Sequence, residues 1–364
     1  MIDLVALLQL VAKKGGSDLH LRAGSPPLIR IDGNLQPLEG DRLNPDDTRE
    51  LAYAIIPLDR RERLEKHKEA DFAHTVQGVG RFRANAYHQR GSISMVFRRV
   101  RVGSPTYEEL GLPPVVGQLA DAPRGLVLVT GPTGSGKTTT LAAMIDQINA
   151  TKAVHILTIE DPIEVLHPAK TSSISQRELG LDTDTYLDAM RSAMRQDPDV
   201  ILIGEMRDFE TVGAALAAAE TGHFVLSTLH TTDAVETVNR VVDFFPAQHQ
   251  HQIRISLASV LRGVICQRLV PRMSGGRVPV VEVLVNNGRI ADRIRDSKIT
   301  DEIAEIIGES TFYGMQTFDQ SLFGLVKRGL VGIEEAMNVA TNPHDFSLML
   351  EQTGLRVSAG SQRA

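Results

Sequence analysis

The sequence predicts an α/β protein of two domains, a small mixed α/β domain followed by a larger one with a parallel sheet. Three observations predict this class. The chain has 364 residues, enough for two domains. A glycine-rich motif joins an apolar run to a helical pattern. Apolar runs then alternate with helical patterns, as in parallel strands covered on both faces by crossover helices, at residues 125–130, 154–159, 200–203 and 224–229.

The first domain is predicted to span residues 1–100. It opens with an amphipathic helix, since apolar residues share one helical face at Leu4, Val5, Leu7, Leu8 and Val11. A further helix is expected to begin at Asn44, and a charged one to cover residues 60–68. Strands are expected at residues 17–21, 27–31, 35–38, 81–87 and 92–97. The mixture indicates a compact α/β unit.

Alternation in the strand at 81–87 places Arg81 and Arg83 together on its polar face. Taken alone, this pattern favours two solvated surface charges. If the protein forms a ring, the two arginines become candidate ligands for the phosphates bound by a neighbouring subunit.

Residues 101–115 are predicted to be an interdomain linker, because they are rich in glycine and proline. The second domain then spans residues 116–364. In its last part, the sequence predicts a long amphipathic helix over residues 248–269 and a strand over 278–285. Shorter helices and, from Leu355, a disordered tail are expected to follow.

The glycine-rich motif begins at Gly131 and reads Gly-Pro-Thr-Gly-Ser-Gly-Lys-Thr. It matches the phosphate-binding loop G-x-x-x-x-G-K-[ST] in a strand, loop and helix context. Glycines let backbone N–H groups surround phosphates, Lys137 adds positive charge, and Thr138 offers a hydroxyl to Mg²⁺. The motif predicts binding of a nucleoside triphosphate by Thr133, Gly134, Ser135, Gly136, Lys137, Thr138 and Thr139.

Polar side chains follow the next three apolar runs. Glu160, Asp161 and Glu164 come after the second run, Glu205 after the third, and His230 after the fourth. Ligands of a parallel sheet bind beyond the carboxyl ends of its strands, so these groups are expected near the phosphates. One carboxylate would hold Mg²⁺ and another would position or deprotonate water. Each could instead be a capping residue, but together they favour a catalytic cluster.

Composition narrows the class of partner. The net charge of −6 and an aromatic fraction of 4%, with no tryptophan, argue against a broad nucleic-acid surface. Cys266 is the single cysteine, which excludes an internal disulfide and favours a reducing compartment. Apolar runs stay below the roughly 18 residues of a membrane span, so any membrane contact is expected to be peripheral.

Several motifs together resemble the PilT family, the retraction motors of type IV pili within the secretion ATPase superfamily. They are Ser17-Asp-Leu-His-Leu21, Arg81-Phe-Arg83, the phosphate loop, Thr158-Ile-Glu-Asp-Pro-Ile-Glu164, Gly204-Glu-Met-Arg-Asp208, Ala219-Glu-Thr-Gly-His223, Thr228-Leu-His-Thr-Thr232 and Gly314-Met-Gln-Thr317. The resemblance covers almost the whole chain. It implies a PAS-like N-terminal domain and a RecA-like ATPase domain with a helical C-terminal portion, which assemble as a homo-hexamer that hydrolyses ATP.

The resemblance also implies roles for individual residues. Glu164 resembles the general base, Glu205 the Walker B acid near Mg²⁺, and His230 the histidine-box sensor. Arg81 and Arg83 resemble the contribution of the N-terminal domain to the nucleotide site. The implied partners are an inner-membrane pilus platform protein and other pilus motor ATPases, with no nucleic acid. The implied location is the cytoplasmic face of the inner membrane at the pilus base.

One segment departs from the family pattern. Where the retraction motors read Ala-Ile-Arg-Asn-Leu-Ile-Arg-Glu, this chain reads Arg-Ile-Ala-Asp-Arg-Ile-Arg-Asp over residues 289–296. Ile290, Ile294 and Arg295 match, whereas Ala291 and Arg293 do not. The motif is tied to retraction, so a paralogue with an accessory or altered role is an alternative. A related DNA-transport or secretion ATPase is a second one.

Overall fold

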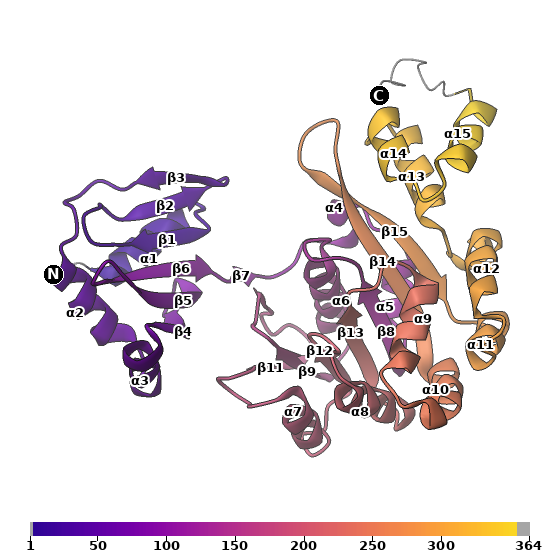
Figure 1. The fold of residues 1–364 in the computed structure, drawn as a ribbon, viewed down its shortest axis with the longest axis horizontal. Helices are drawn as coiled ribbons and strands as arrows, with labels where there is room; N and C mark the ends of the chain where they lie inside the picture. Colours follow the sequence, from indigo (N-terminus) through magenta and orange to yellow (C-terminus); the bar gives the residue numbers. More distant parts are fainter. Residues whose placement is uncertain (1–2, 355–364) are drawn as a thin grey trace. The chain divides into compact units, whose positions relative to one another are not determined.

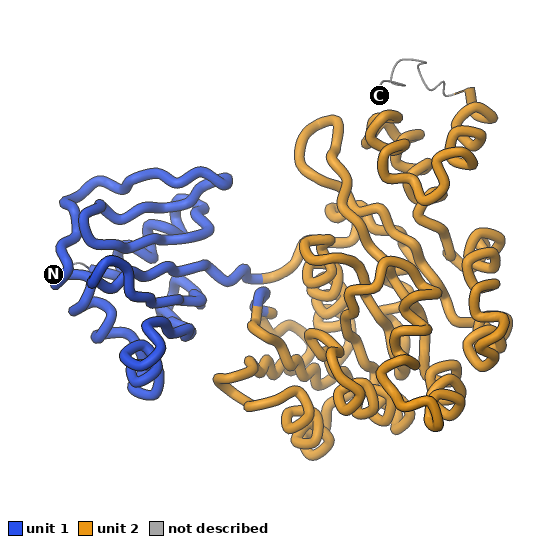
Figure 2. Tube along the Cα trace, viewed as in Figure 1, with its two compact units in different colours: residues 1–102, 164–166 blue, residues 103–163, 167–364 orange. Residues whose placement is uncertain are grey.

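The computed structural model describes residues 3–354 and divides the chain into two compact units. One unit contains the chain up to Val102 together with residues 164–166, and the other contains residues 103–163 and the chain from His167 onward (Figure 2). Both units combine helices with a sheet, so the predicted α/β class is confirmed (Figure 1). The tail predicted from Leu355 lies outside the described residues.

The N-terminal unit is built on an antiparallel sheet of six strands, in the order β3-β2-β1-β6-β5-β4. Its strands are β1 Asp18–Leu21, β2 Leu28–Ile31, β3 Asn34–Pro37, β4 Glu69–Val76, β5 Gly80–Gln89 and β6 Ser92–Arg99. Its helices are α1 Leu4–Lys13, α2 Pro45–Ile55 and α3 Leu58–His67. Strand β5 buries Phe82, Ala84 and Ala86, the face that alternation predicts. A short β7, Arg101–Val102, pairs in parallel with β10, Val165–Leu166.

The C-terminal unit is built on a sheet of seven strands, in the order β11-β9-β12-β13-β8-β14-β15. All neighbours are parallel except β14 and β15. The strands are β8 Gly125–Thr130, β9 His155–Glu160, β11 Ser173–Glu178, β12 Val200–Ile203, β13 Phe224–Leu229, β14 Leu261–Pro271 and β15 Arg277–Val285. The four apolar runs of the sequence therefore form adjacent strands at the centre of the sheet.

Helices cover both faces of this sheet (Figure 1). The helices of this unit are α4 Tyr107–Leu110, α5 Val115–Ala120, α6 Lys137–Thr151, α7 Tyr186–Ala193, α8 Phe209–Glu220, α9 Ala234–Asp243, α10 Ala247–Val260, α11 Gly288–Arg295, α12 Ile303–Glu309, α13 Phe318–Lys327, α14 Ile333–Val339 and α15 Pro343–Gln352, with 3₁₀ turns at Thr300–Glu302 and Thr311–Tyr313. The linker predicted at 101–115 contains β7 and α4.

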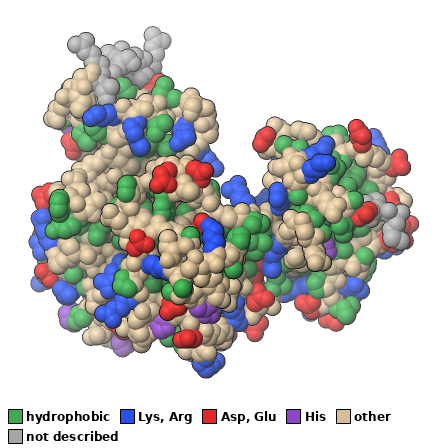
Figure 3. Space-filling view, turned by 180° about the vertical axis from the view of Figure 1, so that it is seen from behind, with side chains coloured by type: hydrophobic (Ala, Val, Ile, Leu, Met, Phe, Trp, Pro, Cys, Tyr) green, Lys and Arg blue, Asp and Glu red, His purple; other side chains and the backbone are tan. Residues whose placement is uncertain are grey.

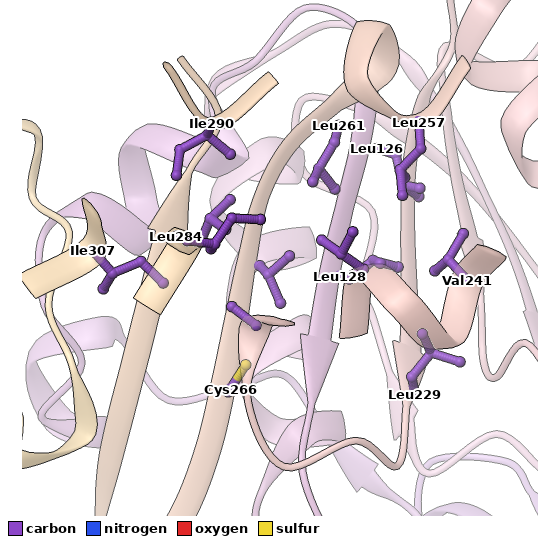
Figure 4. Close-up of a cluster of buried hydrophobic side chains, with 14 of the residues drawn as sticks. Leu126, Leu128, Leu229, Val241, Leu257, Leu261, Cys266, Leu284, Ile290 and Ile307 are labelled. Carbon is purple, nitrogen blue, oxygen red and sulfur yellow. The ribbon is translucent and has the colours of Figure 1, made fainter. Parts of the chain in front are cut away.

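Alternate residues of β8 pack into different cores. Val127 and Val129 lie in a cluster with residues of α5 and α6, whereas Leu126 and Leu128 lie in a cluster with residues of α8 to α10. Figure 4 shows the second cluster, in which Cys266 is surrounded by aliphatic side chains. Because β8 is buried on both sides, the loop that follows it begins from a rigid strand.

The helix predicted over residues 248–269 is wrong in its second half. Helix α10 ends at Val260, and the chain continues directly into β14. The apolar residues of this segment fit a strand as well as a helix. Strand β14 pairs with β8 on one side and β15 on the other, and these backbone hydrogen bonds decide between the two patterns. The described part of the chain has no helix that is long and apolar enough to span a membrane.

Candidate nucleotide site

The phosphate loop connects the end of β8 to the start of α6, as the sequence predicts. Gly134 and Gly136 adopt positive φ values of 79° and 93°, which other residues rarely tolerate. Gly136 is the N-cap of α6, and its helix start has no side-chain cap. The free N–H groups of this 15-residue helix and its dipole favour an anion at this position.

Lys137 lies inside the loop. Its Nζ donates hydrogen bonds to the carbonyl oxygens of Gly131, at 2.7 Å, and Pro132, at 3.1 Å. Partial burial lowers the pKa of Lys137, while the nearby Glu205 carboxylate raises it. The ammonium is therefore bonded to the loop and is near enough to Glu205, beyond the end of another strand, to interact with its charge.

Glu205 follows β12 and contacts two side chains. Arg207 donates to its Oε2 at 2.8 Å, and His230 Nε2, from the end of β13, lies 3.2 Å from its Oε1. Burial raises the pKa of Glu205, but the hydrogen bond and charge of Arg207, with a contribution from His230, lower it overall. The carboxylate is therefore held in its charged form. Arg207 also lies 3.8 Å from Asp161, at the end of β9.

The C-terminal unit thus brings together Lys137, Glu205 and His230, which the sequence placed at separate strand ends. They meet because β8, β13 and β12 are consecutive in the sheet. An ammonium, a carboxylate and a helix N-terminus can bind a phosphate group and its cation together. The described residues contain no group of three or more His, Cys, Asp or Glu side chains that could hold a metal ion.

Three other predicted residues belong to the N-terminal unit. Arg81 and Arg83 are on β5, where they pair across the ladder with Thr75 and Ala73 of β4. Glu164 is exposed and belongs to the same unit. They therefore belong to a different unit from Lys137.

Sequence reasoning missed two residues of the site, Arg207 and Gln267. Arg207 lies two positions from Glu205, and an arginine beside a strand-end acid is a signal that could have been used. Gln267 donates to the carbonyl oxygen of Ser135 at 2.7 Å. The predicted helix over residues 248–269 included Gln267, whereas the residue lies on β14. Its position beside the loop could therefore not be expected.

The chain is similar to known proteins over most of its length. The family described as "Type II/IV secretion system protein" matches residues 104–276. The "Type IV pilus retractation ATPase PilT" of Pseudomonas aeruginosa is 47% identical over 345 residues, which are 95% of this chain and 100% of that protein. The "Type IV pilus ATPase PilU" of the same organism is 42% identical over 95% of this chain and 90% of its own length.

A solved structure, described as the pilus retraction motor PilT with bound ADP, resembles the whole fold. It has a TM-score of 0.87 and 46% sequence identity, and the match covers 95% of this chain and 99% of that one. Identity at this level over nearly the entire length goes well beyond a shared fold. The chain belongs to the PilT family of pilus retraction ATPases, which are enzymes that hydrolyse ATP.

Proposed function

We propose that this chain forms a homo-hexameric ring that hydrolyses ATP to retract type IV pili and so supports twitching motility. The observation that carries the proposal is the charged Glu205, held by Arg207 and His230 close to the phosphate-loop Lys137. Both PilT and a twitching motility protein of Neisseria gonorrhoeae, 44% identical over 88% of this chain, are relatives.

The nucleotide would be held by the backbone and side chains of Thr133 to Thr139. Mg²⁺ would be held by the Thr138 hydroxyl and Glu205. This donor set fits the ion, because Mg²⁺ in such sites takes one or two protein oxygens and completes its shell with phosphate and water. When bound, the ion would neutralise charge that develops on the phosphates.

Glu164 is the proposed general base, and Glu205 is the second candidate. Arg81 and Arg83 are the proposed arginines that reach the nucleotide of a neighbouring subunit. Hydrolysis would change the angle between the two domains, with the segment around residues 103–114 as the hinge. The ring would act on an inner-membrane platform protein, at the cytoplasmic face of the pilus base, with other pilus motor ATPases as further partners.

Replacing Glu164 by Gln tests the assignment of the base. Turnover should fall by about 10²- to 10⁴-fold, the usual contribution of general acid-base catalysis, with ADP binding retained. Glu351→Gln is a matched control, since Glu351 is exposed on α15 and lies outside the motifs shared with the PilT family. An unchanged rate in Glu164→Gln would exclude this residue as the base and leave Glu205 as the candidate.

Mixed rings test whether subunits share active sites. Lys137→Ala subunits added to wild-type protein should depress activity more than in proportion to their fraction. In a ring that works as one unit, a subunit that cannot hold nucleotide would also stall the domain movements of its neighbours. A linear response would show independent sites and count against the ring mechanism.

Helix α11 carries the departure from the retraction motif and favours an accessory paralogue as the second candidate function. Ala291 is buried there, and Arg293 pairs with Glu302 at 2.8 Å. Deletion of the gene distinguishes the two. Excess pili that do not retract would support the retraction motor, and normal twitching would support an accessory role. Bald cells would contradict both.

A nucleic-acid motor is the rival from another class. Figure 3 shows Lys and Arg side chains interspersed with Asp and Glu on the face in view, instead of a continuous basic stripe. A stripe of that kind is what nucleic-acid binding usually requires. ATPase stimulation by single-stranded DNA that disappears at high salt would overturn the pilus assignment.

A further inference from the structure

Gln267 lies beside the phosphate loop although it is 129 residues further along the chain than Thr138. Strand β14 runs parallel to β8, with Cys266 opposite Thr130, the last residue of β8. Gln267 is the next residue on β14, at the level where β8 gives way to the loop. Its side chain is buried, with 3% of the residue exposed.

The carboxamide of Gln267 connects two parts of the nucleotide site. Its Nε2 donates to the carbonyl oxygen of Ser135 in the loop, at 2.7 Å. Its Oε1 accepts from the Thr140 hydroxyl, in the first turn of α6, also at 2.7 Å. One donor and one acceptor are needed at this place, and a glutamine supplies both.

The bond to Ser135 sets the direction of a neighbouring peptide group. In a trans peptide the C=O and the following N–H point in opposite directions. Because Gln267 holds the Ser135 carbonyl, the Gly136 N–H points away from β14. Gly136 is the N-cap of α6, whose first N–H groups are the donors that an anion would meet.

Two glycines of the loop lie directly against Gln267, where a larger residue would not fit. A Cβ on Gly131 would lie 2.2 Å from the backbone oxygen of Gln267, and one on Gly136 would lie 2.6 Å from its Nε2. A Cβ on Gly134, in contrast, would meet nothing within 4 Å. The first and last glycines of the motif therefore allow β14 to approach the loop closely.

We propose that Gln267 is a positioning residue of the ATPase site, which holds the phosphate loop in its binding conformation through the Ser135 carbonyl and the Thr140 hydroxyl. The inference rests on the proposed nucleotide site. It predicts that loss of the two bonds lowers the affinity for the phosphates by more than the accompanying loss of folding stability explains.

The test compares Gln267→Leu with Gln320→Leu, using titration with ADP and steady-state ATPase measurements. Gln320 also makes one bond of each kind: it donates to the carbonyl of Gly308 at 2.9 Å and accepts from the N–H of Thr317 at 3.0 Å, and neither partner belongs to the loop or to α6. We expect Gln267→Leu to raise the Kd for ADP and the KM for ATP by roughly tenfold or more, as two buried hydrogen bonds would imply. Gln320→Leu should change both by less than twofold at a similar loss of melting temperature.

A second variant keeps the proposal testable if Gln267→Leu does not fold. Gln267→Glu can donate to Ser135 only when its carboxyl is protonated, so its ADP affinity should approach that of wild type as the pH falls from 8 to 5.5. A Gln267→Leu variant with wild-type affinity would overturn the proposal, as would a Gln267→Glu variant with the wild-type pH dependence. Lys137→Ala tests the nucleotide site separately from the role of Gln267. Wild-type ADP affinity in this variant would refute the nucleotide site itself.

Discussion

Glu282, on β15, provides a prediction whose size follows from the structure. Its Oε1 accepts the N–H of Ala234, the first residue of α9, at 2.9 Å. Burial and the nearby Asp233 and Asp319 carboxylates raise its pKa, while the Ala234 N–H and Arg268 lower it, and the net value is about 7. Glu282 therefore helps to hold the helix that follows the His230 loop.

The raised pKa makes stability depend on pH. Unfolded Glu282 loses its proton near pH 4.5, whereas the folded protein keeps the proton until about pH 7. The stabilisation is complete below pH 4.5 and is lost as the pH rises through about 7. At about 1.4 kcal/mol per tenfold change in proton affinity, the total is roughly 3 kcal/mol.

Glu282→Gln removes this titration and keeps an acceptor for the Ala234 N–H. The variant should therefore gain stability relative to wild type steadily as the pH rises from about 4.5 to about 7, to a total of roughly 3 kcal/mol that stays constant at higher pH. Urea unfolding followed by far-UV circular dichroism at several pH values measures the difference. Glu220→Gln, at an exposed position, should parallel wild type. Parallel pH curves for Glu282→Gln and wild type would refute the reasoning.

Three further predictions concern the site and the core. Arg207→Ala should raise the pKa of Glu205, because burial then dominates, and shift the acidic limb of the ATPase pH profile upward. Gly131→Ala should weaken ADP binding at least tenfold more than Gly134→Ala in a titration, since only the first side chain meets a backbone oxygen. Cys266 is fully buried and its pKa is raised, so a thiol reagent should react at least 100-fold more slowly with native than with unfolded protein.

Local patterns were sufficient for much of the fold. The apolar runs at 125–130, 200–203 and 224–229 are strands with those bounds, because a strand buried on both faces has a distinctive composition. The segment 248–269 failed, because its apolar residues fit both periods and the choice depends on hydrogen bonds to β8 and β15.

The sequence alone determined that a phosphate loop begins α6 and that acids and a histidine follow the neighbouring strands, because those properties depend on residue type and short-range order. Only the tertiary structure decided which groups meet. The order of strands in the sheet places His230 against Glu205 and aligns Gln267 with the loop. Contacts between residues so far apart in the chain arise from packing and strand register, which no local pattern specifies.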